Sequence, residues 1–361
     1  MAKKKKQQRN WLGRLSFGTV SLAVSGLLVL SYLSMVINPA RAWFFTLFGL
    51  LYPLVLLLAA VLLVWALLRR SRMFWLLLPA LLPSLFFAGR FYQLSGPEEG
   101  EGPEATLKVV SYNVGLFAHG PKGADRLALA DSVSAWLRTQ DADLICLQEF
   151  RLPLEVPVDS WLRTHFPGYK ADYYLLTGRN GRFGNVTLSR LPVLDRGKNS
   201  FAKSTNLALW TDVQLDSSRV RIYNCHFESY NISLSALLTK SGAVEETERK
   251  MRRSIVERPR QVEAVLRDVE GAPVRTVVLG DFNDTPLSYT YYRLLRGRHD
   301  SFVRAGRGFG ATYRTLWPLL RIDYILYPPD LEAVTYTVSR VRHSDHYPIT
   351  ASYYETGRNP R

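Results

Sequence analysis

Three long apolar stretches occupy the first quarter of the chain, and no other feature limits its fold as strongly. They cover residues 15–37, 42–68 and 73–94, and one charged residue, Arg90, lies near the end of the third. A helix of about 20 apolar residues crosses the hydrocarbon core of a bilayer. The first two stretches exceed that length, and the third reaches it when Arg90 extends to the headgroups. The sequence therefore predicts a multi-pass membrane region of about three transmembrane helices.

The basic residues around these stretches predict their orientation. Lys3–Lys6 mark the N-terminus as cytoplasmic, and the three arginines within residues 69–72 mark the second connection in the same way. Three crossings then place the rest of the chain on the extracytoplasmic side, of the inner membrane if the source is bacterial. Pro79 and Pro83 interrupt the third stretch, and a re-entrant third stretch would instead leave the rest of the chain in the cytoplasm.

The charge of the chain is unevenly distributed. The net charge is +15, but residues up to Glu99 contain eleven Lys and Arg against two acidic residues, while the remainder contains 35 against 29. Most of the excess therefore belongs to the membrane region and does not indicate a nucleic-acid surface. The acidic, Gly- and Pro-containing residues 95–105 predict a short, flexible linker, followed by one domain over 106–355 and a tail at 356–361.

Six segments of the predicted domain have the length and apolar content of buried strands, and each carries a polar residue at or near one end. They are 107–114 with Asn113, 143–150 with Glu149, 219–229 with His226, 274–279 followed by Asp281 and Asn283, 321–327 with Asp323, and 347–353 preceded by Asp345 and His346. A polar side chain at the end of a buried strand loses its hydration, and this cost is offset when several such side chains meet. We therefore expect one shared site. Asp281 and Asn283 are two residues apart on an extended segment and face the same side, where they can hold and polarise a water.

Two other segments have helical periodicity. Residues 125–138 predict an outer covering helix, and residues 245–268 predict a second helix that Pro259 should kink or split. Between the histidine strand and the second helix, residues 231–241 form a candidate apolar lip beside the site, and a packed loop is nearly as good an interpretation.

In this order, the strand-end motifs resemble those of the endonuclease/exonuclease/phosphatase superfamily, which includes deoxyribonuclease, neutral sphingomyelinase and inositol-polyphosphate 5-phosphatases. The resemblance extends over about residues 105–355. It implies a four-layer α/β sandwich, with two mixed β-sheets face to face and helices outside, and hydrolysis of phosphoester bonds with Mg²⁺ or Mn²⁺. Leu191 departs from the family, which has an aromatic residue in that turn. His226 stands where abasic-site endonucleases carry tyrosine, which argues against DNA repair.

The resemblance also implies a role for each strand-end residue. Metal ligation falls to Glu149, Asn113 and Asp345, because hard cations such as Mg²⁺ prefer oxygen donors. Catalytic roles fall to five residues: Asp281, Asn283, His226, His346 and Asp323. Asp281 would activate the attacking water and Asn283 would bind the phosphate. The two histidines would donate hydrogen bonds to phosphoryl oxygens or to the leaving group, and Asp323 would orient His346.

The expected function is therefore that of a membrane-anchored, metal-dependent phosphoester hydrolase. We expect a phosphodiesterase that acts near the bilayer surface on a lipid headgroup, a nucleotide or a nucleic acid. The alternative is a catalytically silent, membrane-tethered binding or scaffold module that keeps the fold. The complete set of polar strand ends favours the enzyme, since a silent relative would be free to lose Glu149 or His346.

Overall fold

A computed structural model describes residues 2–97, 105–120, 123–202, 204–216, 218–230 and 243–356. The candidate lip at residues 231–241 and most of the predicted linker lie outside the described residues. The predicted domain boundaries therefore stay predictions.

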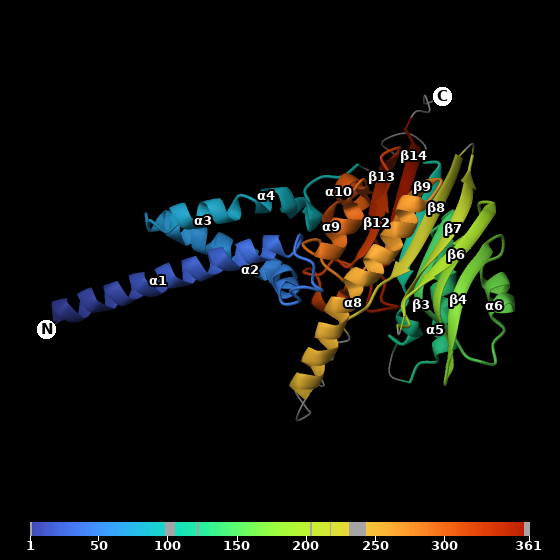
Figure 1. The fold of residues 1–361 in the computed structure, drawn as a ribbon, viewed down its shortest axis with the longest axis horizontal. Helices are drawn as coiled ribbons and strands as arrows, with labels where there is room; N and C mark the ends of the chain where they lie inside the picture. The colour runs from blue at the N-terminus through green and yellow to red at the C-terminus, as the bar shows by residue number, and fades with distance from the viewer. Residues whose placement is uncertain are drawn as a thin grey trace.

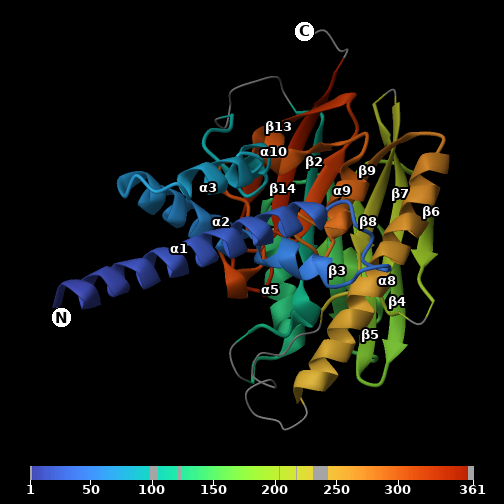
Figure 2. The ribbon, with the colours of Figure 1, turned by 60° about the vertical axis from the view of Figure 1, so that its left-hand side comes forward.

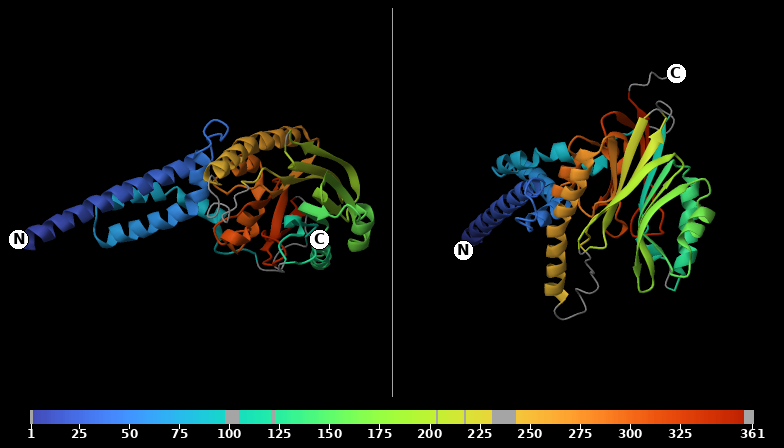
Figure 3. Two further views of the ribbon diagram at one scale, coloured as in Figure 1. Left: turned by 90° about the horizontal axis from the view of Figure 1, so that it is seen from below. Right: turned by 45° about the vertical axis from the view of Figure 1, so that its right-hand side comes forward.

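The N-terminal region is a set of helices packed against one another, α1 (Ala2–Leu33), α2 (Phe45–Leu68), α3 (Phe74–Leu81), α4 (Ser84–Phe87) and the short 3₁₀ helix η1 (Ala88–Arg90). Helix α1 runs from the distant N-terminus towards the rest of the molecule, α2 runs back, and α3 and α4 return (Figures 1 and 3). Helices α1 and α2 thus form a helical hairpin with two distinct ends. One end carries the N-terminus and residues 69–73, and the other end meets the β-strands.

Two of these helices are long and apolar enough to cross a membrane, where the sequence predicts three. They are Ser16–Leu33 and Phe45–Leu68. The third stretch forms a shorter apolar helical segment, Phe74–Arg90, which is divided between α3 and α4. The division falls at Pro83, because a proline has no N–H to continue the helical hydrogen bonds.

The rest of the described chain contains two six-stranded sheets that face each other (Figure 2). The first sheet consists of β13 (Leu331–Val338), β14 (Ile349–Glu355), β2 (Leu107–Asn113), β3 (Leu144–Leu152), β5 (Gly181–Ser189) and β4 (Lys170–Gly178), in that order. The second consists of β10 (His299–Asp300), β12 (Asp323–Tyr327), β9 (Arg275–Asp281), β8 (Ser218–His226), β7 (Leu207–Leu215) and β6 (Val193–Ser200). Both sheets are mixed, since β2 and β3 are parallel, β8 and β9 are parallel, and the other described pairs are antiparallel.

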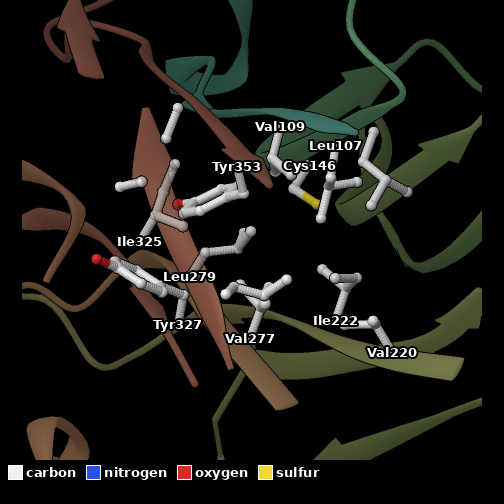
Figure 4. Close-up of a cluster of buried hydrophobic side chains, with 14 of the residues drawn as sticks. Leu107, Val109, Cys146, Val220, Ile222, Val277, Leu279, Ile325, Tyr327 and Tyr353 are labelled. Carbon is white, nitrogen blue, oxygen red and sulfur yellow. The ribbon is translucent and has the colours of Figure 1, made fainter. Parts of the chain in front are cut away.

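Successive side chains of a strand point to opposite faces of its sheet. One set forms an inner core between the two sheets, and the other forms an outer core beneath the covering helices. Val109 and Cys146 of the first sheet meet Ile222 and Leu279 of the second between the sheets (Figure 4). The alternate residues face outward. Helices α5 (Arg126–Thr139) and α6 (Val158–His165) cover the outer face of the first sheet, and helices α8 (Ala243–Gly271) and α9 (Tyr289–Leu295) cover the second. The predicted four-layer α/β sandwich with two mixed sheets is thus confirmed.

Helix α8 is not split at Pro259, although a split is one of the two expected effects of that proline. It is one helix of 29 residues with Pro259 inside. Val262 and Val265, on the C-terminal side of Pro259, are fully buried against the second sheet, and Ile255 on its N-terminal side is buried as well. Burial of both halves outweighs the loss of a single helical hydrogen bond, so the helix continues.

Candidate active site

The predicted strand ends converge at one edge of the sandwich. In the second sheet, the strand register places Asp281 directly beside His226 on one side and beside Asp323 on the other. Asn113 ends β2 of the first sheet and joins the two sheets: its Nδ2 donates hydrogen bonds to Asp281 Oδ2 at 2.9 Å and to Glu149 Oε1 at 3.3 Å. The expectation that the polar ends form one cluster is therefore met for these five residues.

Glu149 reaches this cluster through a β-bulge. The register between β3 and β5 shifts between Leu147 and Phe150, so that two residues of β3 face one residue of β5, and Glu149 has a φ of 50°. Cys146 faces the inner core, and simple alternation would turn Glu149 to the outer face. The bulge instead lets Gln148 and Glu149 both point inward while Phe150 joins the outer core. Glu149 Oε1 then lies 3.5 Å from His226 Nε2.

Asp281 is the buried centre of the cluster. Its side chain is 1% exposed and accepts hydrogen bonds from the backbone N–H of Asn283 at 2.8 Å, from Asn283 Nδ2 at 3.1 Å and from Asn113 Nδ2. The pKa of Asp281 is raised to about 6, chiefly by burial; the nearby His346 opposes this increase and Asp323 adds to it. A carboxylate with this pKa is a competent general base at neutral pH.

Asn283 lies two residues after Asp281 and holds the Asp281 carboxylate in place. Its φ of 52° lies in the left-handed region and folds its side chain back onto the strand end. Its Nδ2 donates to Asp281 Oδ2 and to the carbonyl of Phe227 at 2.9 Å. Gly280, just before Asp281, has a φ of 122°, and a Cβ there would overlap the backbone of Cys225. The backbone of β9 thus comes close to β8 where the two functional side chains meet.

His346 is held in a fixed orientation and charge. Its Nδ1 lies 2.9 Å from Asp323 Oδ2, as the predicted pairing requires, and its Nε2 lies 3.8 Å from Asp281 Oδ2. Burial lowers the pKa of His346, but the carboxylates of Asp323 and Asp281 raise it well above its ordinary value. The imidazole is therefore protonated at neutral pH and can donate from Nε2 into the site. His226 Nε2 is also buried and has no hydrogen-bond partner within the described residues.

Asp281, Asp323 and His346 form a buried group whose ligand atoms lie within 4.8 Å of one another, close enough to hold a metal ion. This group overlaps the predicted catalytic set and not the predicted metal set. The donor atoms of the wider cluster still suit a hard cation, because the carboxylates of Glu149 and Asp281 face each other across Asn113 Nδ2.

The third predicted metal ligand, Asp345, has a different partner. Its Oδ1 lies 3.1 Å from His119 Nε2 and accepts a hydrogen bond from Ser344 Oγ at 3.2 Å. Ser344 Oγ also bonds to the carbonyl of Asn113 at 2.8 Å, so Asp345 remains beside the cluster. The predicted site omits His119, which lies in the loop after β2 and ends no strand.

A buried polar layer beneath the site was also missed. Gln148 Nε2 donates to Asn224 Oδ1 at 2.8 Å, and Asn224 Nδ2 donates in turn to the carbonyl of Val186 at 3.0 Å. Asn185 Nδ2 donates to the carbonyl of Asn224 at 3.1 Å. These three amide side chains link the two sheets directly behind Glu149 and His226. The signal in the sequence is an amide side chain within each of three strands, β3, β5 and β8.

Fold and site together define a hydrolytic α/β sandwich with a carboxylate–histidine centre. A family model described as the Endonuclease/Exonuclease/phosphatase family matches residues 110–346, and the chain belongs to this family. A second model, a domain of unknown function (DUF8431), matches residues 14–91, the N-terminal helices. No curated protein matches the chain significantly.

Solved structures with the same fold are similar to this chain at low sequence identity. An endonuclease/exonuclease/phosphatase from Beutenbergia cavernae is 20% identical, with a TM-score of 0.51 over 70% of this chain and 72% of that one. One from Bacteroides vulgatus is 18% identical, with a TM-score of 0.51 over 69% and 98%. The human Nocturnin catalytic domain, with a bound sulfate anion, is 15% identical, with a TM-score of 0.51 over 71% and 97%. At these identities the similarity establishes the fold alone.

Proposed function

We propose that this protein is a membrane-anchored, divalent-cation-dependent phosphodiesterase that acts at the bilayer surface. The observation that carries the proposal is the pairing of Asp281 with His346. A buried carboxylate whose pKa lies near 6 stands 3.8 Å from an imidazole that Asp323 keeps protonated. One group is suited to take a proton and the other to give one, as phosphoester hydrolysis requires.

In this mechanism, Asp281 orients and deprotonates the attacking water. Protonated His346 donates from Nε2 to a phosphoryl oxygen or to the leaving oxygen, where negative charge develops. Asp323 fixes the tautomer and the charge of His346. His226, whose Nε2 lacks a hydrogen-bond partner within the described residues, is placed to contribute a second donor.

The cation would be held mainly by Glu149, with Asp345 nearby, and Asn113 would orient the Glu149 carboxylate through Nδ2. Mg²⁺ or Mn²⁺ bound there would neutralise charge on the phosphoryl oxygens. Asn113 accepts the backbone N–H of Gly115 through Oδ1 at 3.0 Å, which fixes its Nδ2 between the two carboxylates. Two facing carboxylates bridged by one amide leave an excess of negative charge, which a divalent cation would offset.

Membrane anchoring is supported by the exposure of the two long helices. Only 28% of the Ser16–Leu33 window and 17% of the Phe45–Leu68 window are buried in the protein, so most of their apolar side chains face outward. A core helix of a soluble domain would bury its apolar face. The helical hairpin carries the N-terminus and residues 69–72 at the end away from the sandwich (Figure 1). Since both are basic, we assign that end to the cytoplasm and the sandwich to the extracytoplasmic side.

The test is hydrolysis by the full-length protein in detergent or in nanodiscs. We expect turnover of a generic aryl phosphodiester in Mg²⁺ or Mn²⁺, loss of turnover in excess EDTA, and recovery when the cation is restored. Glu149→Gln serves as the inactive control. If neither an aryl diester nor an aryl monoester is hydrolysed with either cation, the catalytically silent scaffold becomes the better description.

A further inference from the structure

We propose that the N-terminal helices position the catalytic centre and do not serve only as its anchor. They hold the loop that follows Asp281, residues 282–287, which we call the catalytic loop. All three apolar stretches of the N-terminal region contact it. This inference extends the proposed hydrolase function, and the experiment below separates the two.

The first contacts come from α1 and α2. Ser34, the residue after α1, donates from Oγ to the carbonyl of Leu287 at 2.5 Å. Thr285 of the catalytic loop donates from Oγ1 to the carbonyl of Gly49, in the first turn and a half of α2, at 3.3 Å. The Leu287 side chain is fully buried in a cluster with Leu28 and Tyr52 of the two helices. The catalytic loop is thus inserted into the helical hairpin.

The third stretch contributes Arg90, its one charged residue. We expected this side chain to extend to the headgroups, but its Nη1 donates to the carbonyl of Pro286 at 3.1 Å. Its guanidinium also lies over the rings of Phe87 and Tyr291. A guanidinium bound to a backbone carbonyl between two aromatic rings is held in one place, and so is the carbonyl that it binds.

The sandwich holds the same loop from the other side. Arg258 of α8 is 1% exposed and pairs with Asp284 at 3.1 Å, and Tyr324 donates its hydroxyl to the carbonyl of Asp284 at 2.8 Å. Asn283, in its left-handed conformation, immediately precedes these attachments and orients Asp281. Such a conformation is less favourable than the right-handed one and persists only where the surroundings fix it. The helices fix the residues that follow, from Thr285 to Leu287, and so limit the paths that the backbone at Asn283 can take.

Gly49 provides a sharp test of this arrangement. A Cβ at Gly49 would overlap the carbonyl oxygen of Leu287 and Oγ of Ser34, so Gly49→Ala must push on the catalytic loop. Gly26, in α1, has no atom within 4 Å of the position of a Cβ. Gly26→Ala is therefore the matched control, the same substitution in a neighbouring apolar helix, where nothing has to move.

The experiment compares the full-length wild-type protein, Gly49→Ala and Gly26→Ala in nanodiscs. The kinetic substrate is a small aryl phosphodiester at saturating Mg²⁺, and hydrogen exchange of peptides covering residues 282–290 is followed by mass spectrometry. For Gly49→Ala we expect kcat to fall about 10- to 100-fold, since small displacements of catalytic groups have effects of this size, with KM within about twofold. Its catalytic-loop peptides should exchange faster. Gly26→Ala should match the wild type in kcat, KM and exchange.

A second pair keeps the inference testable if Gly49→Ala does not fold. Arg90→Ala should reduce kcat and accelerate exchange of the catalytic loop, and Arg90→Lys, which keeps a donor for the Pro286 carbonyl, should restore part of both. Wild-type kcat and exchange in Gly49→Ala would overturn the inference, and so would equal losses in both glycine variants. If the wild-type protein hydrolyses no phosphoester, the proposed function fails, and the exchange data alone decide whether the helices hold the loop.

Discussion

Replacing Asp281 with Asn should abolish most turnover and yet make the cation-free protein more stable above pH 6. The carboxylate is 1% exposed, and burial together with Asp323 raises its pKa to about 6. In the unfolded chain the same carboxyl group has a pKa of about 3.9. Between these values the folded protein binds a proton that the unfolded chain has released, so stability is lost as the pH rises from about 4 to 6.

The size of the effect follows from this difference in pKa. Ionisation of Asp281 lowers the free energy of unfolding of the wild type by roughly 3 kcal/mol at pH 7.5, where the effect is complete, and by less than about 1 kcal/mol at pH 4.5. Asparagine never ionises and avoids this cost. The stabilisation by Asp281→Asn is smaller than these roughly 3 kcal/mol, because the introduced carboxamide would point one N–H towards the donors Asn113 Nδ2 or Asn283 Nδ2. We therefore expect an increase in melting temperature of several degrees at pH 7.5.

The assay is thermal unfolding of the full-length protein in detergent with EDTA, at pH 4.5 and pH 7.5. Asp330→Asn is the control, because Asp330 is half exposed and pairs with Arg275 at the surface; its effect should stay within about 0.5 kcal/mol at both pH values. Adding Mg²⁺ should stabilise the wild type more than Asp281→Asn. The reasoning is refuted if Asp281→Asn melts below the wild type at pH 7.5 by as much as at pH 4.5.

Four further outcomes are expected. Glu149→Gln should lower turnover at least about 100-fold in Mg²⁺ with little change in melting temperature, as steady-state kinetics and thermal unfolding would report; undiminished wild-type activity in excess chelator would contradict the cation requirement. His346→Ala should lower kcat by about 10²- to 10⁴-fold with KM less affected. Asp323→Asn should move the alkaline limb of the pH–rate profile to lower pH, because the histidine loses the carboxylate that raises its pKa; an unshifted limb would assign that limb to another group. A reporter active only outside the cytoplasm, fused after Arg361, should be active, whereas a fusion active only in the cytoplasm would indicate a re-entrant third stretch.

Much of the sandwich could be predicted because its determinants are local. A buried strand shows in the sequence as a short apolar run, and a polar residue at its end shows that burial is interrupted for a reason. Asn113, His226 and Asp281 were found in this way, and the strand register then brings them together. His346 and Asp323 follow the same logic, since each is a polar residue beside an apolar strand.

Other features depend on geometry that no local pattern carries. Alternation from Cys146 would place Glu149 on the outer face, and only the bulge turns it into the site. A bulge of this kind has no obligatory sequence signal when the residue with positive φ is glutamate. His119 is similar: it becomes a neighbour of Asp345 only because the loop after β2 folds over the strand ends.

The position of the catalytic loop relative to the helical ends bears on the substrate. Leu287 packs against Ser34 and Gly49, which lie at the ends of the two long apolar helices nearest the sandwich. Six residues separate Leu287 from Asp281, a distance of at most about 20 Å even for an extended chain. With those helices in a bilayer, Asp281 therefore lies within about 20 Å of the ends of the spans, the region where lipid headgroups carry their phosphates. A headgroup phosphodiester reaches such a site from the membrane itself, whereas a nucleic acid would have to bind from the aqueous phase. The site position thus favours a lipid phosphoester over a polynucleotide as the substrate of the proposed activity.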